Sequence, residues 1–268
     1  GVDAVHVSGG SYGSIEWIFG ASDSSPGYME DFASAIKTIT DVPVIAVGRI
    51  NDPYYAASVI ESGSADMVAI GRASIADPHF ANKALLGEVS EIIPCIGCHQ
   101  GCSEEMLKGN VATCVVNPFT GHEYEWIIEP AEEKKRVMVA GGGPGGLRAA
   151  WLLAKRGHEV TLYEKEAVLG GQYLLAAYPP GKGDLTKLIR NYIDLCEEYG
   201  VKIVMEKEVD EALIKEENPD AIVLATGGKA LIPEIEGIDN EAFIAANDVL
   251  AGKVLPGQKV LIAGGGMV

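Results

Sequence analysis

The sequence predicts an α/β protein, and three observations support this fold class. Short apolar segments alternate with amphipathic segments over residues 1–90, which indicates parallel strands joined by crossover helices. An apolar strand, a glycine-rich turn and a helix follow one another over residues 137–154. Between these parts, residues 91–125 carry a group of cysteines and show little periodicity. We therefore expect two α/β parts separated by a cysteine-rich segment.

The first part is expected to contain three strand–helix units. Apolar residues at helical spacing predict an amphipathic helix over residues 29–39. Asp52-Pro53 and Asp77-Pro78 each predict a helix start, because an N-capping acid is followed by proline in the first turn. Apolar strands this short fit a closed barrel or an open sheet equally well. The strands are expected at residues 2–7, 44–47 and 67–70.

A charged linker at residues 129–136 predicts a boundary before the second part. Strands are expected at 137–140 and 160–163, and a last strand at 260–263. The sequence begins at Gly1 without methionine and ends within a glycine motif, so we interpret it as a fragment of a longer protein. The predicted division is 1–90, 91–128, 129–233 and 234–268.

The composition excludes several classes of protein. Lys and Arg number 21 against 38 Asp and Glu, and the net charge of −17 would repel a phosphate backbone, so we expect no nucleic-acid partner. No apolar run approaches the roughly 18 residues that span a bilayer, and we recognise no signal peptide. We therefore expect a cytoplasmic protein without a membrane partner.

Cysteines at four closely spaced positions give the strongest chemical signal. In a reducing cytoplasm, such clustering favours a metal site over disulfides. A triplet plus one favours a [4Fe–4S] cluster over structural zinc, which more often uses two CxxC pairs. We expect His99 to be a loop residue near the metal and Cys196 to be a core residue. The predicted metal ligands are Cys95, Cys98, Cys102 and Cys114.

A dinucleotide-binding turn is predicted at Gly141, Gly143 and Gly146. Such glycines permit a tight turn that lets a pyrophosphate approach the helix N-terminus. Glu164 ends the second strand 21 residues after Gly143, where a ligand of the ribose hydroxyls is expected. This motif alone does not separate FAD from NAD.

Gly-Arg pairs follow two of the predicted strands, Gly48-Arg49 and Gly71-Arg72. Glycine lets backbone N–H groups approach an anion, and arginine adds a fork of donors. Loops at the ends of barrel strands often bind phosphate, so we interpret the pairs as a phosphate site. The alternative is that each arginine forms an ion pair with a nearby helix acid, Asp52 or Asp77.

Taken together, these stretches resemble the iron–sulfur flavoenzymes of the Old Yellow Enzyme superfamily, which include 2,4-dienoyl-CoA reductase and 2-enoate reductase. The resemblance covers nearly the whole chain. It implies that residues 1–90 are the C-terminal strands and helices of an FMN-binding (β/α)8 TIM barrel, followed by a [4Fe–4S] segment and a Rossmann-like FAD-binding domain. The matching stretches are 47–53, 65–72, 95–102, 114–118, 169–172 and 180–182.

The resemblance also implies the cofactors. The two Gly-Arg pairs would hold the FMN phosphate, the cysteines the cluster, and the glycine-rich turn with Glu164 the FAD. Gly264 and Gly266 look like the start of an NAD(P)H-binding fingerprint. Residues that resemble the sequences flanking FAD in such flavoproteins are Gly171, Gln172, Thr226 and Gly227.

The implied activity is NAD(P)H-dependent reduction of activated C=C bonds in small molecules, with electrons passing through FAD and the cluster to FMN. Tyr12 is the obvious proton donor in the loop 8–14, and packing of its ring over the flavin is the alternative. Two other functions stay open: an amine dehydrogenase on the same scaffold, and an inactive electron-transfer fragment. The sequence leaves the oligomeric state open, a homo-oligomer included.

Overall fold

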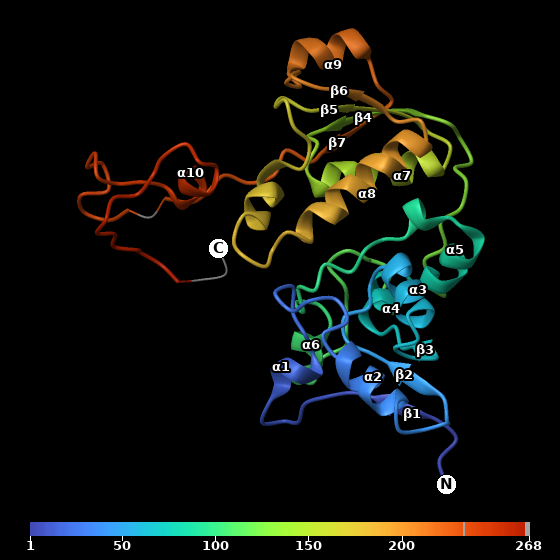
Figure 1. Ribbon diagram of the computed structural model, residues 1–268. Coiled ribbons are helices and arrows are strands. Elements are labelled where there is room, and N and C mark those ends of the chain that lie inside the picture. The colour runs from blue at the N-terminus through green and yellow to red at the C-terminus, as the bar shows by residue number, and fades with distance from the viewer. Residues whose placement is uncertain (233, 266–268) are drawn as a thin grey trace. The chain divides into compact units, whose positions relative to one another are not determined.

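The computed structural model describes residues 1–232 and 234–265 (Figure 1). The chain forms two compact units, Gly1–Glu129 and Pro130–Val268. None of the described helices combines the length and the hydrophobicity needed to span a bilayer. We describe each unit by itself.

The first unit is built on a three-stranded parallel sheet with the order β1-β2-β3. The strands are β1 (Val5–Val7), β2 (Val44–Ala46) and β3 (Met67–Val68), so all three predicted strands are present but shorter than expected. The helices are α1 (Ile15–Ile18), α2 (Glu30–Lys37), α3 (Pro53–Glu61), α4 (Arg72–Ala76), α5 (Phe80–Leu86) and α6 (Ser103–Leu107), with a 3-10 turn at Val89–Glu91.

Apolar residues from the sheet and from α2 and α3 form the core of this unit. Val44 and Ala46 of β2 are fully buried against Ala33 of α2 and Val59 of α3. The helix over residues 29–39 is therefore confirmed as α2, with its apolar face on the sheet.

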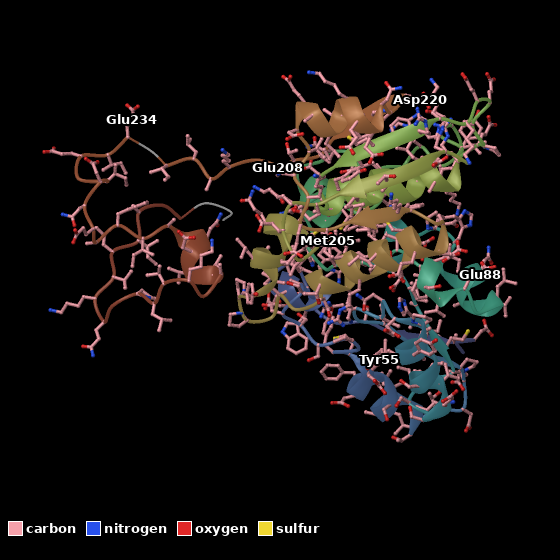
Figure 2. The ribbon with its side chains drawn as sticks, turned by 90° about the horizontal axis from the view of Figure 1, so that it is seen from above. Tyr55, Glu88, Met205, Glu208, Asp220 and Glu234 are labelled. Atoms are coloured by element: carbon pink, nitrogen blue, oxygen red, sulfur yellow. The ribbon has the colours of Figure 1, made fainter. Side chains whose placement is uncertain are left out.

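The start of α3 follows the prediction from Asp52-Pro53. The Asp52 carboxylate accepts hydrogen bonds from the backbone N–H groups of Tyr54 (2.9 Å) and Tyr55 (3.1 Å), and Pro53 occupies the first turn. Tyr55, on α3 (Figure 2), also donates its hydroxyl hydrogen bond to Glu30 at the start of α2. This bond joins the two helices that cover the sheet.

The helix start predicted at Asp77-Pro78 is wrong, because α5 begins at Phe80. The Asp77 carboxylate instead accepts from Lys83 Nζ (2.6 Å) and from the backbone N–H groups of His79 and Ile93 (3.0 Å each). The Asp77 side chain is buried, only 3% exposed, and the Lys83 side chain is partly buried. The bond from the Ile93 N–H fixes the chain two residues before Cys95, the first of the four closely spaced cysteines.

The second unit is built on a four-stranded parallel sheet with the order β6-β5-β4-β7. In order of sequence this is 3-2-1-4, the arrangement at the centre of the Rossmann fold. The strands are β4 (Arg136–Ala140), β5 (Glu159–Tyr163), β6 (Lys202–Val204) and β7 (Ala221–Leu224). The helices are α7 (Pro144–Lys155), α8 (Leu185–Glu198), α9 (Glu211–Glu217) and α10 (Ala246–Leu250), with a 3-10 segment at Gly171–Ala177.

Helices cover both faces of this sheet. Figure 1 shows α7 and α8 on one face and α9 on the other. Leu147 of α7 and Cys196 of α8 are fully buried, and the Cys196 thiol donates to the Leu147 carbonyl oxygen (3.6 Å). Cys196 is therefore a core residue, as predicted.

The last strand predicted, over residues 260–263, is wrong: within residues 1–232 and 234–265, no strand follows β7. The side chains of this segment are open to solvent, with Val260 58%, Leu261 94% and Ile262 81% exposed.

Replacement of Asp77 by alanine should lower the free energy of unfolding by about 3 kcal/mol, because the partly buried Lys83 ammonium group loses its carboxylate partner and the backbone N–H groups of His79 and Ile93 lose their acceptor. Urea denaturation of the full-length protein measures this change. The matched control is Glu104→Ala, which removes the exposed pair with Lys108 (2.9 Å) and should cost less than about 1 kcal/mol. Equal losses in both variants would contradict the structural role of Asp77.

Burial raises the pKa of the Cys196 thiol from its ordinary value of 9.0 to about 12. Because the folded pKa is the higher one, this thiol stabilises the fold below pH 9, and that contribution is lost as the pH rises from 9 toward 12. The Cys196→Ala variant should therefore show a shallower loss of stability over this interval than the wild type. Denaturation curves at pH 8, 9 and 10 check this, and parallel pH profiles would contradict it.

Candidate functional site

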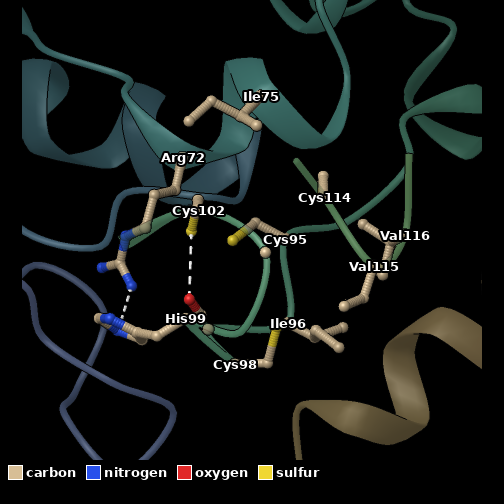
Figure 3. Close-up of a pocket in the computed structure, with 12 residues that line it drawn as sticks. Arg72, Ile75, Cys95, Ile96, Cys98, His99, Cys102, Cys114, Val115 and Val116 are labelled. Carbon is tan, nitrogen blue, oxygen red and sulfur yellow. Dashed lines mark hydrogen bonds between the residues drawn. The ribbon is translucent and has the colours of Figure 1, made fainter. Parts of the chain in front are cut away.

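Four cysteine side chains line one pocket of the first unit (Figure 3). The rest of the wall is mainly apolar, with Arg72 and His99 on one side. All four thiols are partly buried. The sequence-predicted ligands that share this pocket are Cys95, Cys98, Cys102 and Cys114.

Backbone geometry explains why the cysteine loop can curve around the pocket. Gly97 and His99 both have φ of +64°, a left-handed conformation that glycine adopts freely and that histidine tolerates better than most residues. A Cβ atom on Gly101 would lie 2.7 Å from the Thr113 carbonyl oxygen, so only glycine fits there. The Thr113 N–H donates to the Gly101 carbonyl oxygen (2.6 Å), which brings the chain beside Cys102 next to the chain beside Cys114.

Side-chain amides attach the cysteine segment to the ends of the parallel strands. Asn51, just beyond β2, donates from Nδ2 to the Cys95 carbonyl oxygen (2.8 Å). Asn117 donates from Nδ2 to the carbonyl oxygen of Ile75 in α4 (2.9 Å), and the Thr120 hydroxyl donates to the same oxygen (3.2 Å). The loop is thereby held at its start and just beyond its last cysteine.

The strand-end arginines differ in their partners. Arg49 donates from Nη1 to the Ser24 carbonyl oxygen. Arg72 donates from Nη2 to the Gly20 carbonyl oxygen (2.6 Å), and its Nη1 lies 2.6 Å from His99 Nε2. Arg72 therefore links the end of β3 to the cysteine loop.

The helix acids proposed as alternative partners are engaged elsewhere. The Asp52 carboxylate caps α3, and Asp77 bonds to Lys83. A Cβ atom on Gly71 would meet nothing within 4 Å, so the backbone beside Arg72 faces open space. Gly48 has φ of +123°, which requires glycine at the turn before Arg49.

Burial dominates the electrostatics of the pocket. It raises the pKa of the Cys95, Cys98 and Cys114 thiols, and the Arg72 guanidinium opposes this increase at Cys95 and Cys98. Burial, followed by the charge of Arg72, lowers the pKa of His99. The His99 ring is thus favoured in the neutral form, in which Nε2 can accept the hydrogen bond from Arg72.

Among the described residues, no three His, Cys, Asp or Glu side chains converge on a position that could hold one metal ion.

Tyr12 lies in the loop between β1 and α1. Its side chain is 97% exposed and extends into solvent.

The glycine-rich turn of the second unit is shaped by steric contacts. Gly141 has φ of +108°, and a Cβ atom on it would lie 2.4 Å from the Ala225 carbonyl oxygen. A Cβ atom on Gly146 would lie 1.9 Å from the Gly141 carbonyl oxygen. By contrast, a Cβ atom on Gly143, the N-cap of α7, would meet nothing within 4 Å. The turn is therefore tightly packed behind and open where the helix begins.

Glu164 lies beside this turn, next to Gly142, and is 6% exposed. Its carboxylate accepts from the backbone N–H groups of Gly142 (2.7 Å) and Glu166 (2.8 Å). A carboxylate has about four acceptor positions, so two remain for another ligand.

Two further predicted segments flank the turn. The Gly170 N–H donates to the Gly142 carbonyl oxygen (2.8 Å), and a Cβ on Gly171 would lie 3.6 Å from the Gly143 Cα. Gln172 donates to the Gly228 carbonyl oxygen, in the loop after β7 that holds Thr226 and Gly227. Gly264 has φ of +111°, and Gly266 lies outside the described residues.

The sequence analysis missed the residues that dock the cysteine loop. Asn51 immediately precedes the capping acid of α3, and Asn117 precedes Pro118, so both read locally as turn residues. No local pattern indicates their bonds to Cys95 and Ile75, which join residues 44 and 42 positions apart.

Comparison with known proteins connects both units to described families. Residues 6–89 match the NADH:flavin oxidoreductase / NADH oxidase family, and residues 135–268 match the pyridine nucleotide-disulphide oxidoreductase family. The second match covers half of the chain.

Several curated relatives align with the whole chain, two reductases among them. The bilirubin reductase of Mediterraneibacter gnavus is 37% identical over 270 residues, and the cinnamate reductase of Clostridium sporogenes is 36% identical over 268 residues. The chain spans 42% of the first and 40% of the second. Among solved structures, a 2-naphthoyl-CoA reductase in complex with 2-naphthoyl-CoA is 34% identical with a TM-score of 0.90, covering 96% of this chain and 39% of the other.

The contacts at the glycine-rich turn predict opposite effects for two adjacent residues. Gly146→Ala should lower the free energy of unfolding by about 2 kcal/mol, because its Cβ collides with the backbone of Gly141. Gly145→Ala is the matched control: its Cβ meets nothing within 4 Å, and alanine favours the helix by about 1 kcal/mol over glycine. Urea denaturation followed by circular dichroism measures both, and a Gly146→Ala variant as stable as the control would contradict this packing.

Proposed function

The chain belongs to the NADH:flavin oxidoreductases of the 2,4-dienoyl-CoA reductase and Old Yellow Enzyme type, and on this basis we propose that its full-length protein uses NAD(P)H to reduce activated carbon–carbon double bonds. One observation carries the proposal: a strand-end arginine, Arg72, is bonded to the loop that holds four cysteines around one pocket. The names of the relatives, cinnamate and 2-naphthoyl-CoA reductases, support a conjugated carboxylate or thioester as the substrate class.

We propose a [4Fe–4S] cluster in the cysteine pocket. Each thiolate of such a cluster binds a different iron atom, whereas zinc draws its ligands around one point. The four thiols share a pocket. Their spacing in the sequence, a compact triplet plus one instead of two CxxC pairs, supports the cluster over zinc. Metal binding would displace protons from the thiols, at the cost that burial imposes on their charged form.

The strand ends suit a phosphate group, which we propose to be that of FMN. Arg49 and Arg72 supply guanidinium groups whose charge is permanent, and backbone space is open at Gly71. Gly48 provides the turn that places Arg49 after β2.

The second unit suits FAD. Open space at Gly143 lets a pyrophosphate approach the N-terminus of α7, a helix of 12 residues. The free acceptor positions of Glu164 suit the hydroxyls of a ribose. Gly171, Gln172, Thr226 and Gly227 would border the same ligand, and the segment at Gly264 would begin the NAD(P)H-binding part.

Bound flavins and an iron–sulfur cluster supply the hydride and electron transfer that amino-acid side chains do not provide. The chain's own residues bind and orient these groups: the cysteines by ligation, the arginines by charge, and the glycines by close approach of the backbone. We propose a cytoplasmic location for the protein, because the four pocket cysteines must stay reduced to bind iron and disulfides are rare in the cytoplasm.

Tyr12 is our proposed proton donor to the substrate carbon. Its hydroxyl lies in a loop that follows the carboxyl end of β1, where barrel enzymes place their active sites. Tyr12→Phe should lower kcat about 100-fold, the size of a general-acid contribution, and leave reduction of the flavin by NADH unchanged. Stopped-flow kinetics separate the two half-reactions, and unchanged turnover would overturn the role of Tyr12.

The activity is tested by anaerobic absorption spectroscopy of the full-length protein. NADH should bleach the flavin bands, and cinnamate, added as the probe, should restore them. A protein whose flavin bands are bleached by a secondary amine, but not by NADH, would instead be an amine dehydrogenase on the same scaffold. A protein that binds no flavin would overturn the proposal.

A further inference from the structure

We propose that His99 is a positioning residue that couples the strand-end phosphate site to the cysteine pocket through Arg72. This inference rests on the proposed function, because it assigns a role toward FMN and the cluster. Its basis is one contact: the Arg72 Nη1 lies 2.6 Å from His99 Nε2 (Figure 3). In the sequence, His99 lies between Cys98 and Cys102.

The geometry fixes the guanidinium in two directions. Its Nη2 donates to the Gly20 carbonyl oxygen (2.6 Å), while its Nη1 donates to the His99 ring. Arginine has five N–H donors, so three remain for an anion at the strand end. With both outer nitrogens anchored, the side chain loses little rotamer entropy when it binds that anion.

The same contact acts on the cysteine loop. His99 holds a left-handed backbone conformation, with φ of +64°, and its Nε2 faces both Arg72 and the Gly20 carbonyl oxygen (3.1 Å). Phe19 lies edge-on to the His99 ring, with ring centroids 6.5 Å apart. Three segments therefore meet at His99: the chain after α1, the start of α4, and the cysteine loop.

A shared residue makes the two sites thermodynamically linked. A phosphate that orders Arg72 also orders the acceptor to which Arg72 is bonded, and by reciprocity an ordered cysteine loop favours phosphate binding. If Arg72 bound the phosphate without a bond to His99, its replacement would change the affinity for FMN and leave the cysteine loop unaffected.

The test uses the full-length protein with FMN removed and restored, in three variants. His99→Asn tolerates the positive φ of the backbone but is too short to accept from Arg72. His99→Gln restores an acceptor at similar reach. The matched control is His79→Ala, an exposed histidine of the same unit at the start of α5.

Two quantities are measured: the FMN dissociation constant by flavin fluorescence, and the rate of iron release to a chelator with and without FMN. His99→Asn should weaken FMN binding about 10-fold, the effect of one lost hydrogen bond to a charged group. In the wild type, FMN should slow iron release, and in His99→Asn it should not. His99→Gln should regain most of both effects, and His79→Ala should match the wild type.

The outcomes distinguish this inference from the proposed function. If the wild type holds FMN and iron but the His99→Asn variant keeps the wild-type FMN affinity and the FMN-dependent iron release, the coupling alone is overturned. A wild type that holds neither FMN nor iron would overturn the proposed function and this inference together.

Discussion

The hydrogen bonds that attach the cysteine loop to the strand ends are the constraint on which the first unit's site depends. The loop has little regular structure, so its backbone groups need partners from elsewhere. Asn51 satisfies the Cys95 carbonyl oxygen, and Asn117 ties the chain after Cys114 to the Ile75 carbonyl oxygen. Asn51 lies in the connection after β2, and Ile75 lies in α4, which follows β3, so each bond joins the cysteine loop to a segment that follows a parallel strand. The sheet thereby determines where the thiols lie.

In the second unit, the glycine-rich turn depends on close steric contacts. This turn can pack against the loop after β7 only because Gly141 and Gly146 lack side chains. The first turn of α7 is open at Gly143, where a Cβ atom would meet nothing within 4 Å. Close packing at Gly141 and Gly146 and open space at Gly143 together fit the pyrophosphate that we propose to bind there.

Local signals predicted much of the fold and failed where distant residues compete. Asp52-Pro53 begins a helix as expected, yet the identical pair Asp77-Pro78 does not, since Lys83 and the Ile93 N–H engage Asp77. Cysteine spacing predicted which thiols share a pocket. The bonds of Asn51 and of Arg72 to that loop join residues 44 and 27 positions apart, and only the folded chain reveals them.

We propose that the cysteine pocket holds a four-iron cluster, and Mössbauer spectroscopy of the anaerobic, iron-57-labelled full-length protein tests this proposal. We expect the quadrupole doublets of a [4Fe–4S] centre, with iron and acid-labile sulfide in equal amounts. These doublets should be lost when Cys114 is replaced by alanine. Zinc bound in place of iron, or a cluster signal that persists in the Cys114→Ala variant, would contradict it.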